Sequence, residues 1–297
     1  MRRISLLGCG LMGAPMARRL ATAGFPLTLW NRTRAKAEAL ADTGARIANT
    51  PAQAVADADI VITMLEHGGV VAEVLFGGPG LPAQEAAAAG LQPGTLVVDM
   101  SSILPEQARD HAQRLATMGC AALDAPVSGG TLGAEAGTLA IMAGGEAADV
   151  ERARETLQVM GRPVHVGPAG SGQLAKLANQ MIVGITIGAV AEALLLAERG
   201  GADPAKVREA LRGGFAESRI LEVHGQRMVQ GDFAKRGALA IQLKDMRNAL
   251  HTAQGMDFDA PITDALTALY ASAADHGFAE LDQAALFKEL QHRQGKA

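Results

Sequence analysis

Short apolar runs alternate with amphipathic stretches along the first part of the chain. The apolar runs predict buried strands at Ile4–Leu7, Leu27–Trp30, Ile60–Met64 and Leu96–Asp99. The stretches between them have helical spacing at Ala14–Ala23, Arg34–Thr43 and Pro51–Ala56. A βαβ alternation of this kind predicts a parallel sheet covered by helices on both faces.

A further round of the alternation follows, and then the pattern changes. It predicts helices at Glu106–Met118 and Ala148–Met160, and strands at Ala121–Ala125, Leu139–Ala143 and Val164–Val166. Beyond the glycine-rich segment Gly167–Gly172 the pattern favours helices alone, beginning with a long apolar helix over Gln173–Arg199. We therefore predict an α/β fold: an N-terminal Rossmann domain with a doubly wound parallel sheet at residues 1–166, and an all-α domain at 167–297, joined by a long helix.

The glycine pattern at the first strand points to a cofactor. The segment Gly8-Cys9-Gly10-Leu11-Met12-Gly13 has the form GxGxxG, follows the first strand directly and opens the first helix. In that position the first glycine permits the tight turn, the second lets a pyrophosphate approach the backbone, and the third packs the helix on the sheet. The helix N-terminus attracts phosphate. We expect Gly8, Gly10, Leu11, Met12 and Gly13 to bind a dinucleotide, although a plain turn with packing glycines is the alternative.

The residues after the second strand bear on the choice of cofactor. An acidic residue there would bind the ribose 2′-hydroxyl of NAD, whereas arginine accommodates a 2′-phosphate. This chain has Asn31, Arg32 and Thr33, followed by Arg34, and no carboxylate. We predict NADP(H), with NAD possible; the alternative is that both arginines are ordinary surface charges.

Composition and charge limit the partners and the compartment. Hydrophobic residues make up 48% of the 297, and the net charge is −4, which predicts neither nucleic-acid nor membrane binding. Cys9 and Cys120 form no CxxC pair, as expected in the cytoplasm, and Cys9 fits a small buried residue. No signal peptide is expected, and the apolar stretch Leu177–Ala191 is too short to span a membrane.

The histidines do not predict a metal site. They show no i, i+4 pair and no cysteine neighbours, so we expect surface or capping roles for all seven, His67, His111, His165, His224, His251, His276 and His292.

Three further segments carry a family resemblance. They are Asp124–Gly130 (DAPVSGG), Gly170–Gln180 (GSGQLAKLANQ) and Leu243–Met246 (LKDM). With the glycine loop they resemble, in order and over most of the chain, the β-hydroxyacid dehydrogenase family. The run Gly213–Gly225 is most similar to the branch that reduces tartronate semialdehyde.

The resemblance implies the roles of several residues. Lys176 matches the catalytic lysine and Asn179 its neighbour in the site, while Ser128, Gly129 and Gly130 match the loop that binds the substrate carboxylate. The positions that match cofactor contacts are Met64, Leu65, Ser102 and Lys244. It also implies a substrate cleft between domains and a homodimer or homotetramer.

The chemistry of the helix lysine agrees with this resemblance. Lys176, Asn179 and Gln180 are spaced i, i+3 and i+4, so a helix presents them on one face. Reduction of an aldehyde requires a hydride and a proton, and a lysine ammonium can supply the proton and stabilise the developing alkoxide. The alternatives are a lysine that only snorkels from an apolar helix, a flexible turn at Ser128–Gly130 and a solvated pair at Lys244-Asp245.

The expected activity is hydride transfer between NADP(H) and a small hydroxyacid or semialdehyde, with reduction of tartronate semialdehyde to glycerate favoured. A 3-hydroxyisobutyrate dehydrogenase and a succinic semialdehyde or glyoxylate reductase remain alternatives, as does a non-catalytic NADP-sensing protein. Two positions depart from the family pattern. Glu66 stands where proline is frequent, and Arg236-Gly237-Ala238 replaces a usual Pro-Gly-Phe.

Overall fold

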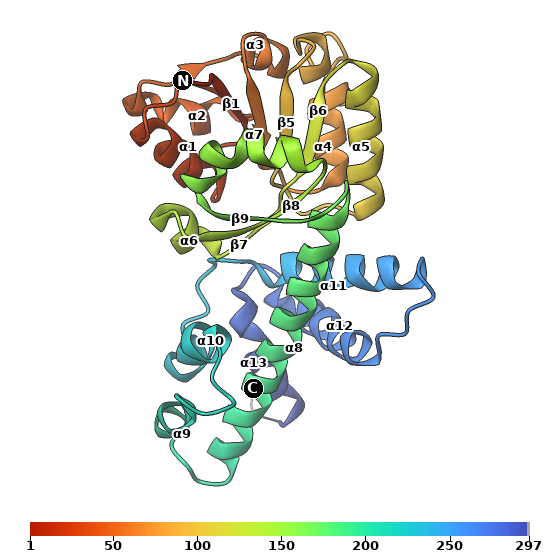
Figure 1. Cartoon of the computed structure of the whole chain (residues 1–297). Coiled ribbons are helices and arrows are strands. Elements are labelled where there is room, and N and C mark those ends of the chain that lie inside the picture. Colours follow the sequence, from red (N-terminus) through yellow and green to blue (C-terminus); the bar gives the residue numbers. More distant parts are fainter. Residues whose placement is uncertain (296–297) are drawn as a thin grey trace. The chain divides into compact units, whose positions relative to one another are not determined.

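The computed structural model describes residues 1–295 and divides the chain into two compact units (Figure 1). The first unit is Met1–Lys176 and the second is Leu177–Ala297. Helix α8 (Ser171–Arg199) begins in the first unit and ends in the second. This division falls inside α8, ten residues beyond the boundary at 166/167 drawn from the sequence pattern.

A nine-stranded sheet forms the centre of the first unit. Its order is β3-β2-β1-β4-β5-β6-β8-β7, and β9 pairs with β8. The strands are β1 (Ile4–Leu7), β2 (Leu27–Trp30), β3 (Arg46–Ile47), β4 (Ile60–Thr63), β5 (Leu96–Asp99), β6 (Ala121–Asp124), β7 (Val127–Ser128), β8 (Leu139–Gly144) and β9 (Gly161–Gly167). All pairings from β3 through β6 are parallel, in the order of a doubly wound Rossmann fold. The predicted fold class is thus confirmed.

The helices of the first unit follow the predicted alternation, with some differences. They are α1 (Gly13–Thr22), α2 (Arg34–Glu38), α3 (Pro51–Val55), α4 (Gly68–Phe76), α5 (Pro105–Thr117), α6 (Gly130–Ala136) and α7 (Ala147–Gln158). The helix expected over Arg34–Thr43 is broken into α2 and a 3-10 turn at Ala41–Thr43. Helices α4 and α6 and the two-residue strands β3 and β7 were not predicted, because short elements have too few residues to show a period.

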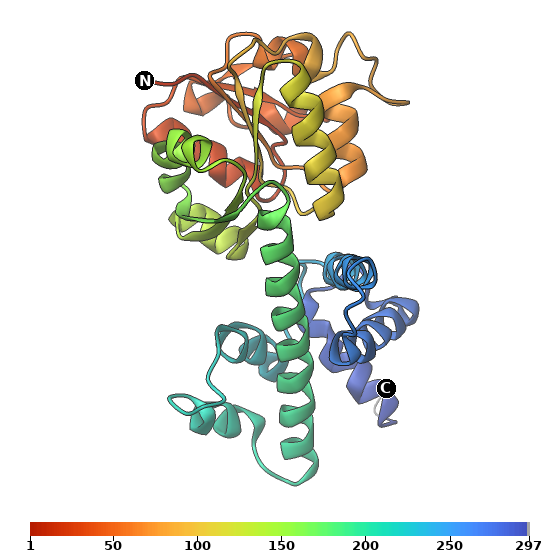
Figure 2. The same ribbon diagram turned by 45° about the vertical axis from the view of Figure 1, so that its right-hand side comes forward.

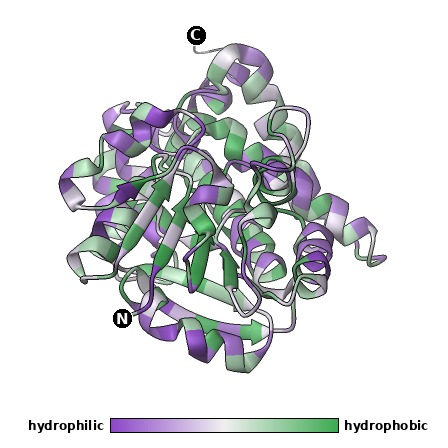
Figure 3. Ribbon diagram, turned by 90° about the horizontal axis from the view of Figure 1, so that it is seen from above, coloured by the Kyte–Doolittle hydropathy of each residue, from purple (hydrophilic) through white to green (hydrophobic). Residues whose placement is uncertain are grey.

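Alternate residues of each strand supply two hydrophobic cores, one on each face of the sheet. Ile4 and Leu6 of β1 pack with Met16 and Leu20 of α1 in one core. Leu7 of β1 packs in the other core, which α3, α4 and α5 cover. Side chains two apart in a strand share a face, so strands that are buried on both faces are mostly apolar. Figure 3 shows the hydrophobic strands between helices with hydrophilic outer faces.

The second unit consists of helices packed around the C-terminal part of α8. They are α9 (Pro204–Leu211), α10 (Arg219–Gln230), α11 (Leu239–Gln254), α12 (Pro261–Ala273) and α13 (Leu286–Arg293), with a π turn at Ala274–Phe278 and a 3-10 turn at Gln283–Ala285. In Figure 2, α9 and α10 lie on one side of this part of α8, and α11 to α13 lie on the other. Asp203 and Ser218 cap α9 and α10 with their side chains.

Helix α8 is longer than the apolar stretch Leu177–Ala191 that it contains. It has 29 residues, and its length and composition would allow it to cross a membrane, but buried core helices share these properties. Within its most apolar window, 44% of the residues are buried inside the structure.

One histidine assignment was wrong. His67 caps α4 through its side chain, as expected of a capping residue. His111, however, is buried in α5 with 6% of its surface exposed. Its ring packs against Phe76 at a centroid distance of 5.6 Å, so the surrounding apolar residues hold it inside the fold. Both cysteines are buried and free.

Candidate active site

Five parallel strands of the first unit end in one row. Leu7 is in register with both Trp30 and Thr63, Thr63 with Asp99, and Asp99 with Asp124. The segments that contain the predicted cofactor and carboxylate residues directly follow this row. The carboxyl ends of parallel strands form the edge where ligands bind in open α/β sheets. The sheet therefore brings these segments to one edge.

The glycine loop between β1 and α1 has the space that a dinucleotide requires. A methyl group on Gly8 would lie 2.3 Å from the Met64 carbonyl oxygen, and one on Gly13 would lie 1.8 Å from the Gly8 carbonyl oxygen. A methyl group on Gly10 would meet nothing within 4 Å. The first and third glycines are thus needed for the fold, while Gly10 leaves its backbone open to a ligand. The loop fits a pyrophosphate. Leu11 follows Gly10 in the chain and is 69% exposed.

The residues after β2 are tied to the glycine loop. The side-chain oxygen of Asn31 accepts a hydrogen bond of 2.9 Å from the Cys9 backbone N–H, and its amide nitrogen donates to the Thr33 carbonyl at 2.9 Å. Arg34 is paired with Glu38 at 2.7 Å and also contacts Asn49. Arg32 is exposed and has no side-chain ion pair within residues 1–295. Of the two arginines, Arg32 is the one available to a ligand.

The segments after β4 and β5 are joined by a serine. The Leu65 backbone N–H donates a 2.9 Å hydrogen bond to the Ser101 hydroxyl. Met64 is bound through its own N–H to the Leu7 carbonyl at 2.9 Å. Ser102 follows the buried Ser101 and is half-buried. These contacts place Met64, Leu65 and Ser102 around one edge of the sheet.

Lys176 is buried beside the predicted carboxylate loop. Its side chain extends from α8, is 9% exposed, and its Nζ donates a 2.8 Å hydrogen bond to the carbonyl oxygen of Val127. Val127 precedes Ser128 in β7, and Gly129 precedes α6. The ammonium group therefore lies next to the residue that begins the Ser128–Gly130 segment.

The backbone of that segment requires glycine. Gly129 has a φ of 140° and Gly130 a φ of 63°, which residues with a side chain rarely adopt. A methyl group on Gly130 would meet nothing within 4 Å. Exposed backbone N–H groups in such a turn suit an anion, and the Ser128 hydroxyl is half-buried beside them.

Two side chains that sequence analysis did not single out hold the start of α8. The two carboxylate oxygens of Asp124 accept hydrogen bonds of 2.8 Å from the backbone N–H groups of Gly170 and Gln173. The Gln173 side chain accepts from the Ile103 N–H at 3.0 Å and donates to the Ser101 carbonyl at 2.8 Å. Both residues belong to the motifs that carry the family resemblance, and this was the only sign of their importance in the sequence. Lys176 is thus held three residues beyond a doubly anchored glutamine.

The remaining predicted residues belong to a buried polar cluster of the second unit. The Gln180 side chain donates to Asp245 at 2.7 Å and to Gln242 at 3.1 Å, and accepts from Asn179 at 2.8 Å. Lys244 is paired with Asp245 at 3.1 Å, and Asp245 is 1% exposed. The pair is therefore anchored rather than solvated. Gln242 was missed, because a single glutamine in an amphipathic helix carries no sequence signal of burial.

Within residues 1–295, no group of three or more His, Cys, Asp or Glu side chains could hold a metal ion. The first unit combines an open glycine loop, a turn of two glycines with positive φ at Gly129–Gly130, and the buried amino group of Lys176.

Comparisons with known proteins agree with this combination. Residues 3–169 match the family described as the NAD binding domain of 6-phosphogluconate dehydrogenase. Residues 170–290 match the NAD-binding domain of NADP-dependent 3-hydroxyisobutyrate dehydrogenase. Together the two matches cover nearly the whole chain.

Individual relatives extend over the full length as well. The chain is 41% identical to 2-hydroxy-3-oxopropionate reductase of Escherichia coli over 97% of both chains. It is 34% identical to NAD-dependent L-serine dehydrogenase of Pseudomonas aeruginosa over 100% of both. The solved structure of Mycobacterium tuberculosis 3-hydroxyisobutyrate dehydrogenase with L-serine has a TM-score of 0.87 and 33% identity, covering 98% of this chain and 99% of that one. The chain therefore belongs to the β-hydroxyacid dehydrogenase family of NAD(P)-dependent oxidoreductases.

Proposed function

We propose that the protein reduces tartronate semialdehyde to glycerate with NADPH, using Lys176 as the proton donor. The observation that carries the proposal is the position of Lys176. Its buried Nζ is 2.8 Å from the carbonyl of Val127, directly before the Ser128–Gly130 anion site. A short substrate whose carboxylate binds that turn would present its carbonyl group close to the ammonium.

The residues of the chain have distinct tasks in this reaction. Bound NADPH supplies the hydride. The Lys176 ammonium donates a proton to the carbonyl oxygen. General acid catalysis of this kind typically raises the reaction rate by about 10² to 10⁴-fold. The charge of Lys176 also stabilises the alkoxide that develops on that oxygen. The Ser128 hydroxyl and the N–H groups of Gly129 and Gly130 hold the carboxylate and fix the orientation of the substrate.

Three observations support NADPH over NADH. No carboxylate follows β2, where one would bind the 2′-hydroxyl of NAD. Arg32 is exposed there, and guanidinium groups match phosphate geometry. The family matched by residues 170–290 is described as NADP-dependent.

The identity of 41% to 2-hydroxy-3-oxopropionate reductase supports the choice of substrate. Relatives that act on other hydroxyacids are also similar, including the L-serine dehydrogenase at 34%. The choice therefore has to be tested against these compounds directly.

In the second unit, Ala238 is buried with 3% of its surface exposed, so the small residue there is part of the packed structure.

A substrate panel tests the proposal. The oxidation of NADPH and of NADH is followed at 340 nm with tartronate semialdehyde, methylmalonate semialdehyde, succinic semialdehyde and glyoxylate. The oxidation of L-serine and of 3-hydroxyisobutyrate is followed at the same wavelength with NADP⁺ or NAD⁺. We expect the highest kcat/KM with tartronate semialdehyde and NADPH. A higher value with another compound would replace the substrate, and NADPH binding without any turnover would favour a sensor.

We further propose that the protein is a homodimer or homotetramer. The support is the exposed apolar surface of the helices in the second unit, with Ile182 67%, Leu196 76% and Ile262 61% exposed. A second copy of the chain would cover these apolar side chains in an interface. Light scattering should give a multiple of the 30.6 kDa chain mass, and Leu196→Glu should lower it. A monomeric wild-type protein would contradict the proposal.

A further inference from the structure

Asp99 is a buried carboxyl group in the row of residues that end the parallel strands. It ends β5, in register with Thr63 of β4 on one side and Asp124 of β6 on the other. Its Oδ1 accepts a 2.7 Å hydrogen bond from the Thr63 hydroxyl and a 3.0 Å hydrogen bond from the Ser101 N–H. One oxygen of this carboxyl thus holds the first turn of the segment that leads to Ser102.

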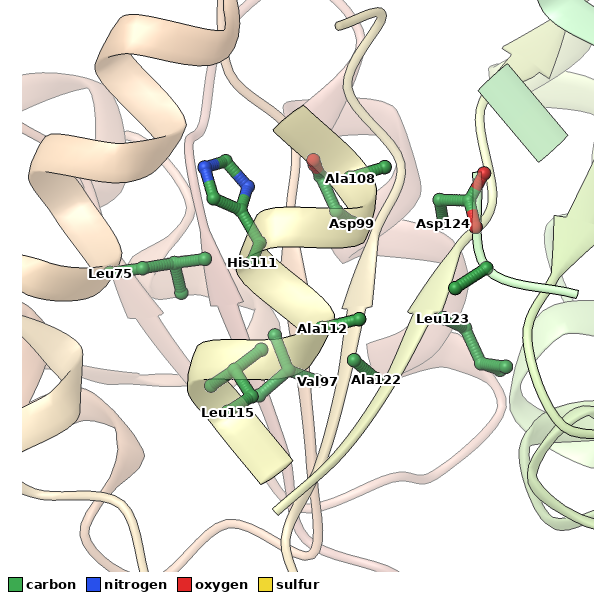
Figure 4. Close-up of a pocket in the computed structure, with 11 residues that line it drawn as sticks. Leu75, Val97, Asp99, Ala108, His111, Ala112, Leu115, Ala122, Leu123 and Asp124 are labelled. Carbon is green, nitrogen blue, oxygen red and sulfur yellow. The ribbon is translucent and has the colours of Figure 1, made fainter. Parts of the chain in front are cut away.

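The other oxygen faces a different environment. Asp99 Oδ2 and His111 Nδ1 are both buried and have no hydrogen-bond partner within residues 1–295. Both side chains line one cavity of about 20 Å³ between α5 and the sheet, which Figure 4 shows with Asp124 on its far side. A cavity of roughly 10–15 Å³ is large enough for one water molecule, provided that polar groups line it. Two buried polar atoms that remain unsatisfied would each destabilise the fold, because burial removes their hydrogen bonds to water.

The protonation states of the two groups suit a shared water molecule. Burial lowers the pKa of His111 below its ordinary value, so its ring is neutral at pH 7; one ring nitrogen then donates and the other accepts, and the tautomer decides which role Nδ1 has. Burial also raises the pKa of Asp99 to about 6, against the hydrogen bonds from Ser101 and Thr63. The carboxyl is therefore ionised at pH 7, and a water molecule can donate to its Oδ2 while it exchanges a second hydrogen bond with His111.

Ser101 connects Asp99 to both parts of the candidate site through hydrogen bonds. Its hydroxyl accepts from the Leu65 N–H at 2.9 Å, on the predicted cofactor side. Its carbonyl accepts from the Gln173 side chain at 2.8 Å, three residues before Lys176 in α8. A shift of Ser101 would therefore move Leu65 and the start of α8 together.

We propose that Asp99 is a positioning residue of the reductase, and that a single buried water molecule bridges its Oδ2 to His111 Nδ1. Held by Thr63 on one oxygen and by this water on the other, the carboxyl fixes Ser101, and through it the cofactor segment and the helix of Lys176. The catalytic part of this inference rests on the proposed function. The water site and the effect on cofactor binding do not depend on the choice of substrate.

Paired variants at position 99 test the role. Asp99→Asn keeps an oxygen for Thr63 and Ser101 and offers its amide to the water, whereas Asp99→Ala loses all three contacts. We expect Asp99→Ala to weaken NADPH binding about tenfold or more and to lower kcat about 10- to 100-fold, because a displacement of about 1 Å can cost 10²-fold in rate. Asp99→Asn should stay within about threefold of the wild type in both. NADPH affinity is measured by quenching of Trp30, the single tryptophan.

Two further variants separate positioning from general stability. Thr156→Val removes another buried hydroxyl of the first unit that has no hydrogen-bond partner within the described residues, and it should leave NADPH affinity and kcat unchanged. Thr63→Val removes one hydrogen bond of Asp99 and should shift both quantities in the direction of Asp99→Ala, by about two- to fivefold. This variant decides the question if Asp99→Ala does not fold.

A high-resolution crystal structure tests the water directly. Density for one water molecule within hydrogen-bond distance of Asp99 and His111 is expected in the wild type and not in His111→Phe, which keeps the ring against Phe76. An empty cavity in the wild type would overturn the bridge. Equal NADPH affinity and kcat in Asp99→Ala and wild type, or equal losses in Asp99→Asn and Asp99→Ala, would overturn the positioning role. A wild type without turnover would refute the proposed function, while affinity and density would still decide this inference.

Discussion

The backbone N–H of Cys9 donates a 2.9 Å hydrogen bond to the side chain of Asn31. This bond joins the glycine loop after β1 to the loop after β2, where the family distinguishes its cofactors. Asn31 occupies the place at which an acidic residue would bind a ribose hydroxyl, and here it supports the loop instead. Under the proposed use of NADPH, recognition of the 2′-phosphate falls to the neighbouring residues, and the prediction for Arg32 follows from it.

Gly10 and Gly13 should respond in opposite ways to the same substitution. A methyl group on Gly10 meets open space, so Gly10→Ala should fold with near-normal stability but weaken NADPH binding at least about tenfold, because it fills the approach to the backbone. A methyl group on Gly13 would collide with the Gly8 carbonyl, so Gly13→Ala should lower the free energy of unfolding by about 1–3 kcal/mol. Urea unfolding and NADPH titration measure the two effects. Normal NADPH affinity in Gly10→Ala would contradict the placement of the pyrophosphate.

Arg32 should determine the preference for NADPH, whereas Arg34 should not. Arg34 is paired with Glu38 and contacts Asn49, while Arg32 is exposed. We expect Arg32→Ala to raise the KM for NADPH about tenfold or more and to leave the KM for NADH within about twofold, since only NADPH carries the phosphate. Arg34→Ala is the matched control. The interpretation fails if both arginines, or neither, change the ratio of the two KM values.

Lys176→Ala should abolish most turnover without unfolding the protein. Loss of the ammonium removes the proton donor, so kcat should fall about 10² to 10⁴-fold. The Val127 carbonyl loses one hydrogen bond, which costs about 1 kcal/mol of stability. NADPH affinity should remain near that of the wild type.

Lys206→Ala provides the control for this substitution. Lys206 is 76% exposed on α9, pairs with Glu209 and is not among the residues proposed to take part in the reaction. Its kcat should equal that of the wild type. A kcat in Lys176→Ala that is also close to the wild-type value would remove the basis of the proposed mechanism.

The second unit should lose stability in acid through Asp282. Burial alone would raise the pKa of this carboxyl, but the contact with His224, the hydrogen bond from the Ala284 N–H and the charge of Arg227 lower it to about 2. The folded state thus binds the proton more weakly than the unfolded state. The contribution, about 2 kcal/mol, is present above pH 4 and disappears as the pH falls toward 2.

Urea unfolding at pH 7, 5 and 3 measures this dependence. Asp282→Asn should be less stable at pH 7 by about 3–5 kcal/mol, because Arg227 loses a buried counter-charge. The difference from the wild type should shrink at pH 3. Glu289, whose pKa is also about 2, keeps its own part of the pH dependence. A constant difference from pH 7 to pH 3 would show that Asp282 does not titrate as described.

Several parts of the fold followed from local patterns. The strand Leu96–Asp99 was predicted with its observed bounds, and α8 was predicted to within two residues at its start. Both predictions rest on the runs of apolar residues themselves. Strand β7, with two residues, and helix α6, with the composition GTLGAEA, were missed because neither contains such a run.

Burial of polar residues was harder to predict. The sequence placed His111 at the surface, and it gave no role to Asp99, Gln173 or Gln242, all of which are buried. Most buried polar groups have a hydrogen-bond partner, and that partner is often far away in the chain. For Gln173 that partner is Ser101, 72 residues away.

The sequence alone therefore determined the alternation of strands and helices, the glycine loop and the motifs that define the family, because these depend on residues within a few positions of one another. Only the tertiary structure decided that Asp99, Ser101, Gln173 and Asp124 support one another behind Lys176. Those contacts exist because parallel strands end in a common row, and pairing between strands brings together residues that are far apart in the chain.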